Sequence, residues 1–339
     1  MKIIRKKAHA RAGFLGNPSD GYNGKTISFI IRNFSAEVVL YEWEQVEIVM
    51  AEQDRGRFRS VYDLANDVKL HGYYGGIRLI KATIKRFVEY CDVRQIPLHS
   101  QNFSIRYNSD IPRQVGLAGS SSIIVATLRC LMEFYEVKIP EEVQPSFVLS
   151  VEQEELGISA GLQDRVIQVY EGLVFMNFDK SVEKTVSGYR CYEYERLNPA
   201  LLNNVYIAWH DGLSEPTEVY HNDIRGRFLR GEEKVVNAMK RFASIAAEGK
   251  QALQNCDLDT LPKLINENFD LRRSISKIPE WQVEMVETAR SCGASAKFAG
   301  SGGAIVGTYR DEEMLGKMAE KLSEMEVRTI VPQVDLDLN

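Results

Sequence analysis

The spacing of apolar and polar residues predicts strands in the first fifty residues and a helix soon after them. Apolar and β-branched residues predict strands at 3–16, 25–33, 36–41 and 45–50. Apolar residues then recur every three or four positions over 77–91, which indicates an amphipathic helix. The chain therefore opens with a small sheet and a helix to cover it.

The middle of the chain alternates between helices and strands. A strand at 103–107 precedes a loop at 112–122 and an apolar helix that starts near 123. Further patterns predict a helix at 141–156, another after 165, and a strand at 172–178. Residues 179–199 are polar and weakly patterned, so we interpret Asn198–Pro199 as a domain junction.

The second half is dominated by helices. The expected elements are a strand at 204–209, helices at 217–254, 257–275 and 281–292, strands at 296–298 and 304–309, a helix at 311–325 and a strand at 327–331. These elements predict an α+β protein with two domains, 1–198 and 199–339.

Composition narrows the class of protein. The 339 residues are 44% hydrophobic and 26% charged with a net charge of −5, which is typical of a globular protein and argues against a nucleic-acid partner. No apolar run approaches the ~18 residues of a membrane helix. The five cysteines are widely spaced, so we expect free, mostly buried thiols and a cytoplasmic location.

The loop at 112–122 has the chemistry of a phosphate site. Gly116 and Gly119 allow a ligand oxygen to approach the backbone, and the helix that follows presents free N–H groups. The hydroxyls of Ser120, Ser121 and Ser122 could hold a phosphate oxygen or Mg²⁺. The alternative is an ordinary turn in which the serines cap the helix.

Two other glycine-rich stretches carry polar groups. Residues 10–24 read as a rigid turn that presents Arg11, Asn17 and Asp20, or else as a plain loop between strands. A second glycine loop covers 297–304. Asp164 lies among apolar residues, where an unpaired carboxylate is costly.

These three loops, in this order, resemble the motifs of the GHMP kinases. The resemblance implies a ribosomal-protein-S5-domain-2-like N-terminal domain, a ferredoxin-like C-terminal domain and an active site between them. The first motif is similar to that of galactokinases in Arg11, Asp20 and the stretch 22–24, whereas Asn17–Pro18 replaces a Glu-His pair. That replacement argues against galactose as the substrate.

Four further stretches, 71–76, 111–114, 160–165 and 268–273, resemble plant-type glucuronokinases. The resemblance implies ATP-dependent phosphorylation of the anomeric hydroxyl of D-glucuronate, which gives D-glucuronate 1-phosphate and ADP. The alternatives are a kinase for another sugar or sugar acid, such as galacturonate or galactose, and a non-catalytic ligand-binding protein of the same fold. The chain is expected to be a monomer or homodimer without a membrane or nucleic-acid partner.

The resemblance also implies roles for individual residues. Asp164 would accept the proton of the sugar hydroxyl, or only orient the sugar, and Arg11 would keep it ionised or stabilise the γ-phosphoryl group. Ser121, or else Ser120, would hold Mg²⁺ together with Glu152. Contacts to ATP are expected from Tyr73, Tyr74, Pro112, Gly116, Leu117, Ala118, Gly119, Ser120, Ser121 and Ser122.

The resemblance also implies residues that contact the sugar acid. These contacts would come from Asn17, Asp20, Tyr22, Arg113, Gly161, Arg272, Gly300, Ser301, Gly302 and Gly303. Because a carboxylate favours a bidentate arginine, Arg113 or Arg272 is the hypothesised clamp, ahead of Arg165 and Arg273.

Overall fold

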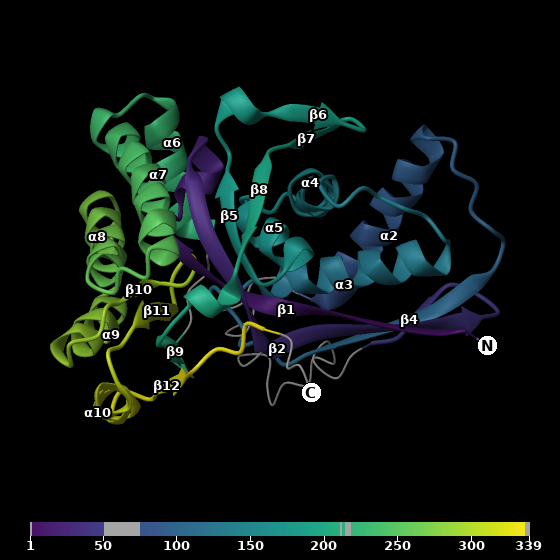
Figure 1. The fold of residues 1–339 in the computed structure, drawn as a ribbon. Coiled ribbons are helices and arrows are strands. Elements are labelled where there is room, and N and C mark those ends of the chain that lie inside the picture. Colours follow the sequence, from purple (N-terminus) through teal and green to yellow (C-terminus); the bar gives the residue numbers. More distant parts are fainter. Residues whose placement is uncertain (1, 51–74, 211, 214–217, 336–339) are drawn as a thin grey trace, which may run out of the picture.

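The chain folds around two separate sheets, each covered by its own helices (Figure 1). This computed structural model describes residues 2–50, 75–210, 212–213 and 218–335. Tyr73 and Tyr74, which were expected at the nucleotide, lie outside the described residues. None of the helices in the described ranges combines the length and apolar character needed to cross a bilayer.

The first sheet is built around one long strand. Its strands are β1 (Ile3–Leu15), β2 (Lys25–Trp43), β3 (Glu47–Ile48), β4 (Asn102–Ser109), β5 (Leu173–Asn177) and β8 (Glu193–Leu197). They follow the order β3-β4-β2-β5-β8, and β1 pairs with β2. The antiparallel β1–β2 register places Ile3 opposite Tyr41 and Leu15 opposite Ile27, so β1 reaches the end of the sheet where β5 joins.

The predicted strand over 3–16 and the predicted turn over 10–24 overlap, and the structure favours the strand as far as Leu15. Arg11 therefore projects from β1, and the two strands expected over 25–41 are one. Ala8, Ala10 and Ala12 are buried, and β1 packs against α3 (Gly119–Phe134). Alanine and glycine are weak strand formers, but small side chains let a helix lie close to the sheet.

Helices α2 (Gly76–Val93), α3, α4 (Gln144–Ser150) and α5 (Gln163–Tyr170) cover this sheet (Figure 1). The helix expected over 141–156 is present but changes type, because α4 ends at Ser150 and a π-helical turn, Val151–Glu155, continues it. The weakly patterned segment at 179–199 contains β8 and the hairpin β6 (Lys184–Val186) and β7 (Tyr189–Cys191). Short strands with mostly exposed side chains leave little hydrophobic pattern to detect.

The second sheet has the order β10-β11-β9-β12 and is antiparallel throughout. Its strands are β9 (Val205–His210), β10 (Lys297–Phe298), β11 (Ala304–Thr308) and β12 (Val327–Ile330). Its helices are α6 (Glu218–Leu229), α7 (Glu233–Gln254), α8 (Thr260–Ile275), α9 (Glu280–Ser291) and α10 (Glu312–Ser323). The long helix expected over 217–254 is therefore two helices, with a break at Gly231, where φ is +73°.

Several segments of the chain connect the first sheet and its helices with the second sheet and its helices. Asn198 and Pro199 lie between β8 of the first sheet and β9 of the second, and the boundary there stays a prediction. Helix α7 packs against β2. After β12 the chain returns to the first sheet, where the Arg32 amide donates to the Gln333 carbonyl at 2.7 Å. All five cysteines are free and three are buried, as predicted.

Candidate active site

The side chain of Arg11 joins all three glycine-containing motifs. Arg11 is 5% exposed, and its Nε donates to Asp164 Oδ1 at 2.7 Å. Its Nη1 donates to the carbonyl oxygens of Gly116 (2.6 Å) and Ala299 (3.0 Å). One guanidinium therefore holds together β1, the loop before α3, the start of α5 and the loop after β10.

The second and third glycine loops pack against each other. A Cβ on Gly116, whose φ is +74°, would lie 2.7 Å from the Gly302 carbonyl oxygen. A Cβ on Gly300 would overlap the Gly116 carbonyl oxygen and lie 2.8 Å from Arg11 Nη1. Glycine is required at both positions because the two backbones touch.

The first turn of α3 starts at the second glycine loop. The helix follows Ala118, which has a left-handed φ of +64° and makes no side-chain capping hydrogen bond. The hydroxyls of Ser121 and Ser122 donate to the Ala118 carbonyl, at 3.3 and 2.9 Å, and not to the helix. The alternative in which these two serines cap α3 is therefore wrong, and the positive end of the helix dipole faces the glycine loop.

A network of charges surrounds Asp164. Its arginine partners offset the free energy that burying an unpaired carboxylate among apolar residues would cost. Its Oδ2 lies 3.4 Å from Arg165 Nη1, in addition to the bond from Arg11. Arg165 Nε donates to Glu152 Oε2 at 2.6 Å, and its Nη2 reaches the same oxygen. Glu152 is 1% exposed, and burial raises the pKa of its carboxyl despite the Arg165 charge.

Asp20 is a second carboxylate beside Asp164. Its Oδ2 accepts a hydrogen bond from the Gln163 amide at 3.3 Å, and a Cβ on Gly161 would overlap the same oxygen. Burial, and then the charge of Asp164, raise the pKa of Asp20 to about 6. The two carboxyl groups therefore have different partners: Arg11 and Arg165 contact Asp164, whereas Asp20 accepts a hydrogen bond from a backbone amide.

The raised pKa of Asp20 gives a pH-dependent stability. Above pH 6 this carboxylate is charged in both the folded and the unfolded chain, so folding bears the full cost of burying it. The Asp20→Asn variant should gain roughly 1 to 2 kcal/mol in free energy of unfolding at pH 8. The gain should shrink as pH falls from about 6 toward 4, because the folded wild type then takes up a proton. Urea denaturation across this range measures it, and a loss of stability at pH 8 would contradict it.

Lys297 is a buried cation that the sequence reasoning did not single out. It is 1% exposed, and its Nζ donates to Gly13 O (2.6 Å), Asn17 Oδ1 (2.5 Å) and Phe298 O (2.8 Å). Burial, with help from Arg272 and Arg11, holds the pKa of Lys297 well below its usual range. The detectable signal was a lone lysine within the apolar stretch 296–299.

Several residues expected to contact the sugar make protein contacts here. Asn17 Nδ2 donates to the Gly300 carbonyl at 3.5 Å, and its Oδ1 is bound by Lys297. Arg272 is 5% exposed and donates to the carbonyls of Gly300 (3.3 Å) and Ser301 (2.9 Å). Both therefore support the third motif, whereas Arg113 is exposed on the loop before α3.

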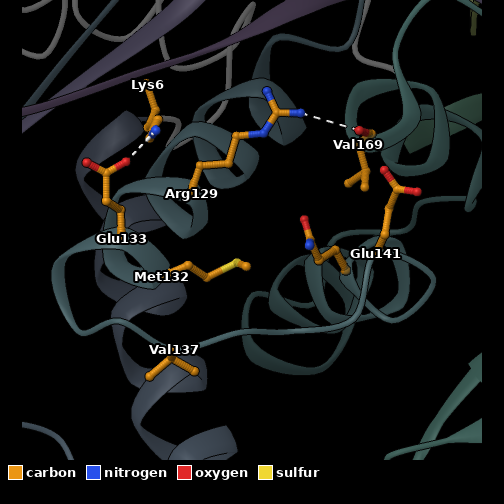
Figure 2. A pocket seen from close by; sticks show the side chains of 8 residues that line it. Lys6, Arg129, Met132, Glu133, Val137, Glu141 and Val169 are labelled. Carbon is orange, nitrogen blue, oxygen red and sulfur yellow. Dashed lines mark hydrogen bonds and ion pairs between the residues drawn. The ribbon is translucent and has the colours of Figure 1, made fainter.

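An open hollow of about 430 Å³ lies elsewhere, at the far end of α3 (Figure 2). Its wall includes Met132 and Glu133, fourteen residues or so beyond the first turn of α3, which corresponds to roughly 20 Å of helix. Lys6 pairs with Glu133 there at 2.5 Å, and Arg129 donates to the Val169 carbonyl at 3.4 Å. This hollow is separate from the three motifs.

Comparisons with known proteins agree with this arrangement. Residues 78–172 match the GHMP kinases N terminal domain, and residues 250–327 match the GHMP kinases C terminal domain. Glucuronokinase 1 of Arabidopsis thaliana is 45% identical over 89% of this chain and 84% of its own length. Probable glucuronokinase 2 of the same plant is 44% identical over 90% and 84%. The chain belongs to the GHMP kinase family.

Solved structures support the fold. The crystal structure of Lactococcus lactis galactokinase in complex with galactose superimposes with a TM-score of 0.76 over 98% of this chain and 94% of that one, at 13% identity. The predicted two-domain α+β fold is thereby confirmed, and the family models and the Arabidopsis relatives confirm the predicted family. The roles predicted for individual site residues stay predictions.

Proposed function

We propose that this protein is an ATP-dependent kinase that phosphorylates the anomeric hydroxyl of D-glucuronate, giving D-glucuronate 1-phosphate and ADP. The observation that carries the chemistry is the position of Arg11, whose guanidinium touches both the glycine loop before α3 and Asp164. The substrate is inferred from the similarity to the two Arabidopsis proteins.

The donor in this proposal is ATP, bound with its phosphates at the loop 112–122. Backbone N–H groups at the first turn of α3 and the positive end of its dipole suit a triphosphate. Ser121 and Glu152 offer the hydroxyl and carboxylate oxygens that Mg²⁺ prefers, and both bonds from Arg165 fall on Oε2 of Glu152, which leaves Oε1 for the ion. Bound Mg²⁺ would neutralise charge on the phosphates.

The acceptor reacts beside Asp164. The anomeric oxygen bonds to the γ-phosphorus while the bond from that phosphorus to the bridging oxygen breaks, and ADP carries away the electron pair. Asp164 takes the hydroxyl proton, and Arg11 holds this carboxylate in place through the 2.7 Å bond. The Gly300–Gly303 loop closes the site, with Arg272 bound to its backbone and Lys297 bound to the Phe298 carbonyl just before it.

The proposal extends to the whole chain. The segment 1–198 would carry the nucleotide and 199–339 would supply the third motif. The protein would act in the reducing cytoplasm, in keeping with five free thiols, as a monomer or homodimer.

A coupled ADP-release assay tests the proposal. With Mg²⁺ and ATP we expect kcat/KM for glucuronate to exceed that for galacturonate, galactose, glucose and mevalonate, and ³¹P–¹H coupling to H1 should identify the product as a 1-phosphate. Higher activity on galactose than on either uronate would overturn the substrate. If none of the five acceptors supported ADP release, the proposed reaction would be overturned.

A further inference from the structure

The buried arginines at the three motifs are already engaged with protein groups. Arg11 binds Asp164 and two carbonyls, Arg165 binds Glu152, and Arg272 binds the third-motif backbone. If the acceptor is a uronate, as proposed above, its carboxylate needs another cation, because an unpaired carboxylate in a cleft is costly. This inference rests on that proposed function.

Helix α6 brings an additional arginine to the first motif. Phe228 of α6 packs its ring on Tyr22, with 4.8 Å between the ring centroids and 60° between the planes. Ile224 is 3% exposed and belongs to the same apolar cluster, which fixes the rotation of α6 about its axis. Arg225 precedes Phe228 by three residues, so the two side chains are neighbours on one side of α6.

Arg225 is exposed and uncommitted. It forms no ion pair or side-chain hydrogen bond with any residue in the described ranges, in contrast to Arg227 two positions later, which binds Glu232 at 2.8 Å. The short helical turn Ser19–Tyr22, which carries Asp20 and Tyr22, also contacts α7, the helix that follows α6. Arg225 therefore stands at the edge of the first motif with its guanidinium available.

The pKa of Tyr22 agrees with the position of Arg225 at the edge of the first motif. Burial and then the charge of Asp20 raise the pKa of the Tyr22 phenol to about 12, while the charges of Arg225 and Arg272 lower it. Arg225 and Asp20 therefore both lie within electrostatic range of one phenol. A ligand that touches Tyr22 would meet the carboxylate of Asp20 and the guanidinium of Arg225.

We propose that Arg225 binds the carboxylate of the acceptor sugar and so selects uronates over neutral sugars. Asp20 and Tyr22 would then hold sugar hydroxyls, and Asp164 the reacting one. This proposal differs from the hypothesis drawn from the sequence, in which the clamp is Arg113 or Arg272. Arg272 is bound to the third motif, and Arg113 belongs to the loop before α3, where the phosphates are expected.

Steady-state kinetics of Arg225→Ala and Arg225→Lys test the proposal, with glucuronate and glucose as acceptors. For Arg225→Ala we expect KM for glucuronate to rise at least tenfold with kcat within about threefold of wild type, because a charge-assisted contact to the substrate is lost. KM for glucose should be unchanged, and Arg225→Lys should recover part of the loss. Because the side chain is exposed, folding should be unaffected, which circular dichroism checks.

Arg230→Ala, which removes an exposed arginine just beyond the same helix, is the matched control and should leave both KM values unchanged. An equal rise in KM for glucuronate and glucose, or no rise for glucuronate, would overturn the role of Arg225 while the kinase activity stands. Wild-type protein that does not phosphorylate glucuronate would instead overturn the proposed function, and the role of Arg225 with it. The two failures are thus distinguishable.

Discussion

Asp164→Asn should lower kcat for glucuronate by about 10²- to 10⁴-fold, because the amide cannot accept the proton of the attacking hydroxyl. The amide oxygen can still accept the bond from Arg11 Nε, so the structure around it should persist. Single-turnover measurements with Mg²⁺-ATP and saturating glucuronate would isolate the chemical step.

The matched control is Asp92→Asn, an exposed aspartate at the end of α2, which should leave kcat unchanged. If Asp164→Asn raised KM for glucuronate and left kcat unchanged, proton transfer to this residue would be contradicted. In that outcome the carboxylate would orient the sugar and the hydroxyl would lose its proton to solvent or phosphate.

Arg11→Met should be damaging to both activity and stability. The variant removes the ion pair with Asp164 and the hydrogen bonds from Nη1 to the carbonyls of Gly116 and Ala299, of which the Ala299 carbonyl keeps the bond from the Gly13 amide. We expect the free energy of unfolding to fall by about 3 kcal/mol, since the variant breaks a mostly buried ion pair and leaves Asp164 with only the longer contact to Arg165. Urea denaturation measures this loss, and kcat should fall at least a hundredfold.

Arg11→Lys separates charge from geometry. A lysine keeps the positive charge but lacks the planar fork that bonds to Asp164 and to two carbonyls at once. It should therefore recover stability only in part, with kcat well below that of wild type. If Arg11→Met unfolded with the wild-type midpoint and slope, Arg11 would not be holding the three motifs together.

Local patterns in the sequence were sufficient for most of the elements. The period of α2 and the apolar residues of β4 and β9 depend on which residues face the core, and these patterns are written in neighbouring positions. The order of the three glycine-containing motifs was also readable, because each is a short continuous stretch. These features led to the α+β two-domain fold and to the GHMP kinase family.

Elements with weak local patterns were not predicted correctly. The end of β1 reads as a turn because alanine and glycine fill it, and only pairing with β2 and packing under α3 make it a strand. The strand β8 at the sheet edge has mostly exposed side chains, so its sequence lacks a buried face. In both places the hydrogen-bond partner, which is distant in sequence, determines the structure.

The sequence alone determined the elements, the motifs and the family of this protein, because those depend on residues that are close along the chain. Only the tertiary structure decided what each charged side chain binds. Arg11 meets Asp164 across 153 positions, and Lys297 meets Asn17 across 280. The strength of such contacts depends on burial and on distances of a few ångströms, neither of which exists until the sheets and helices have packed together.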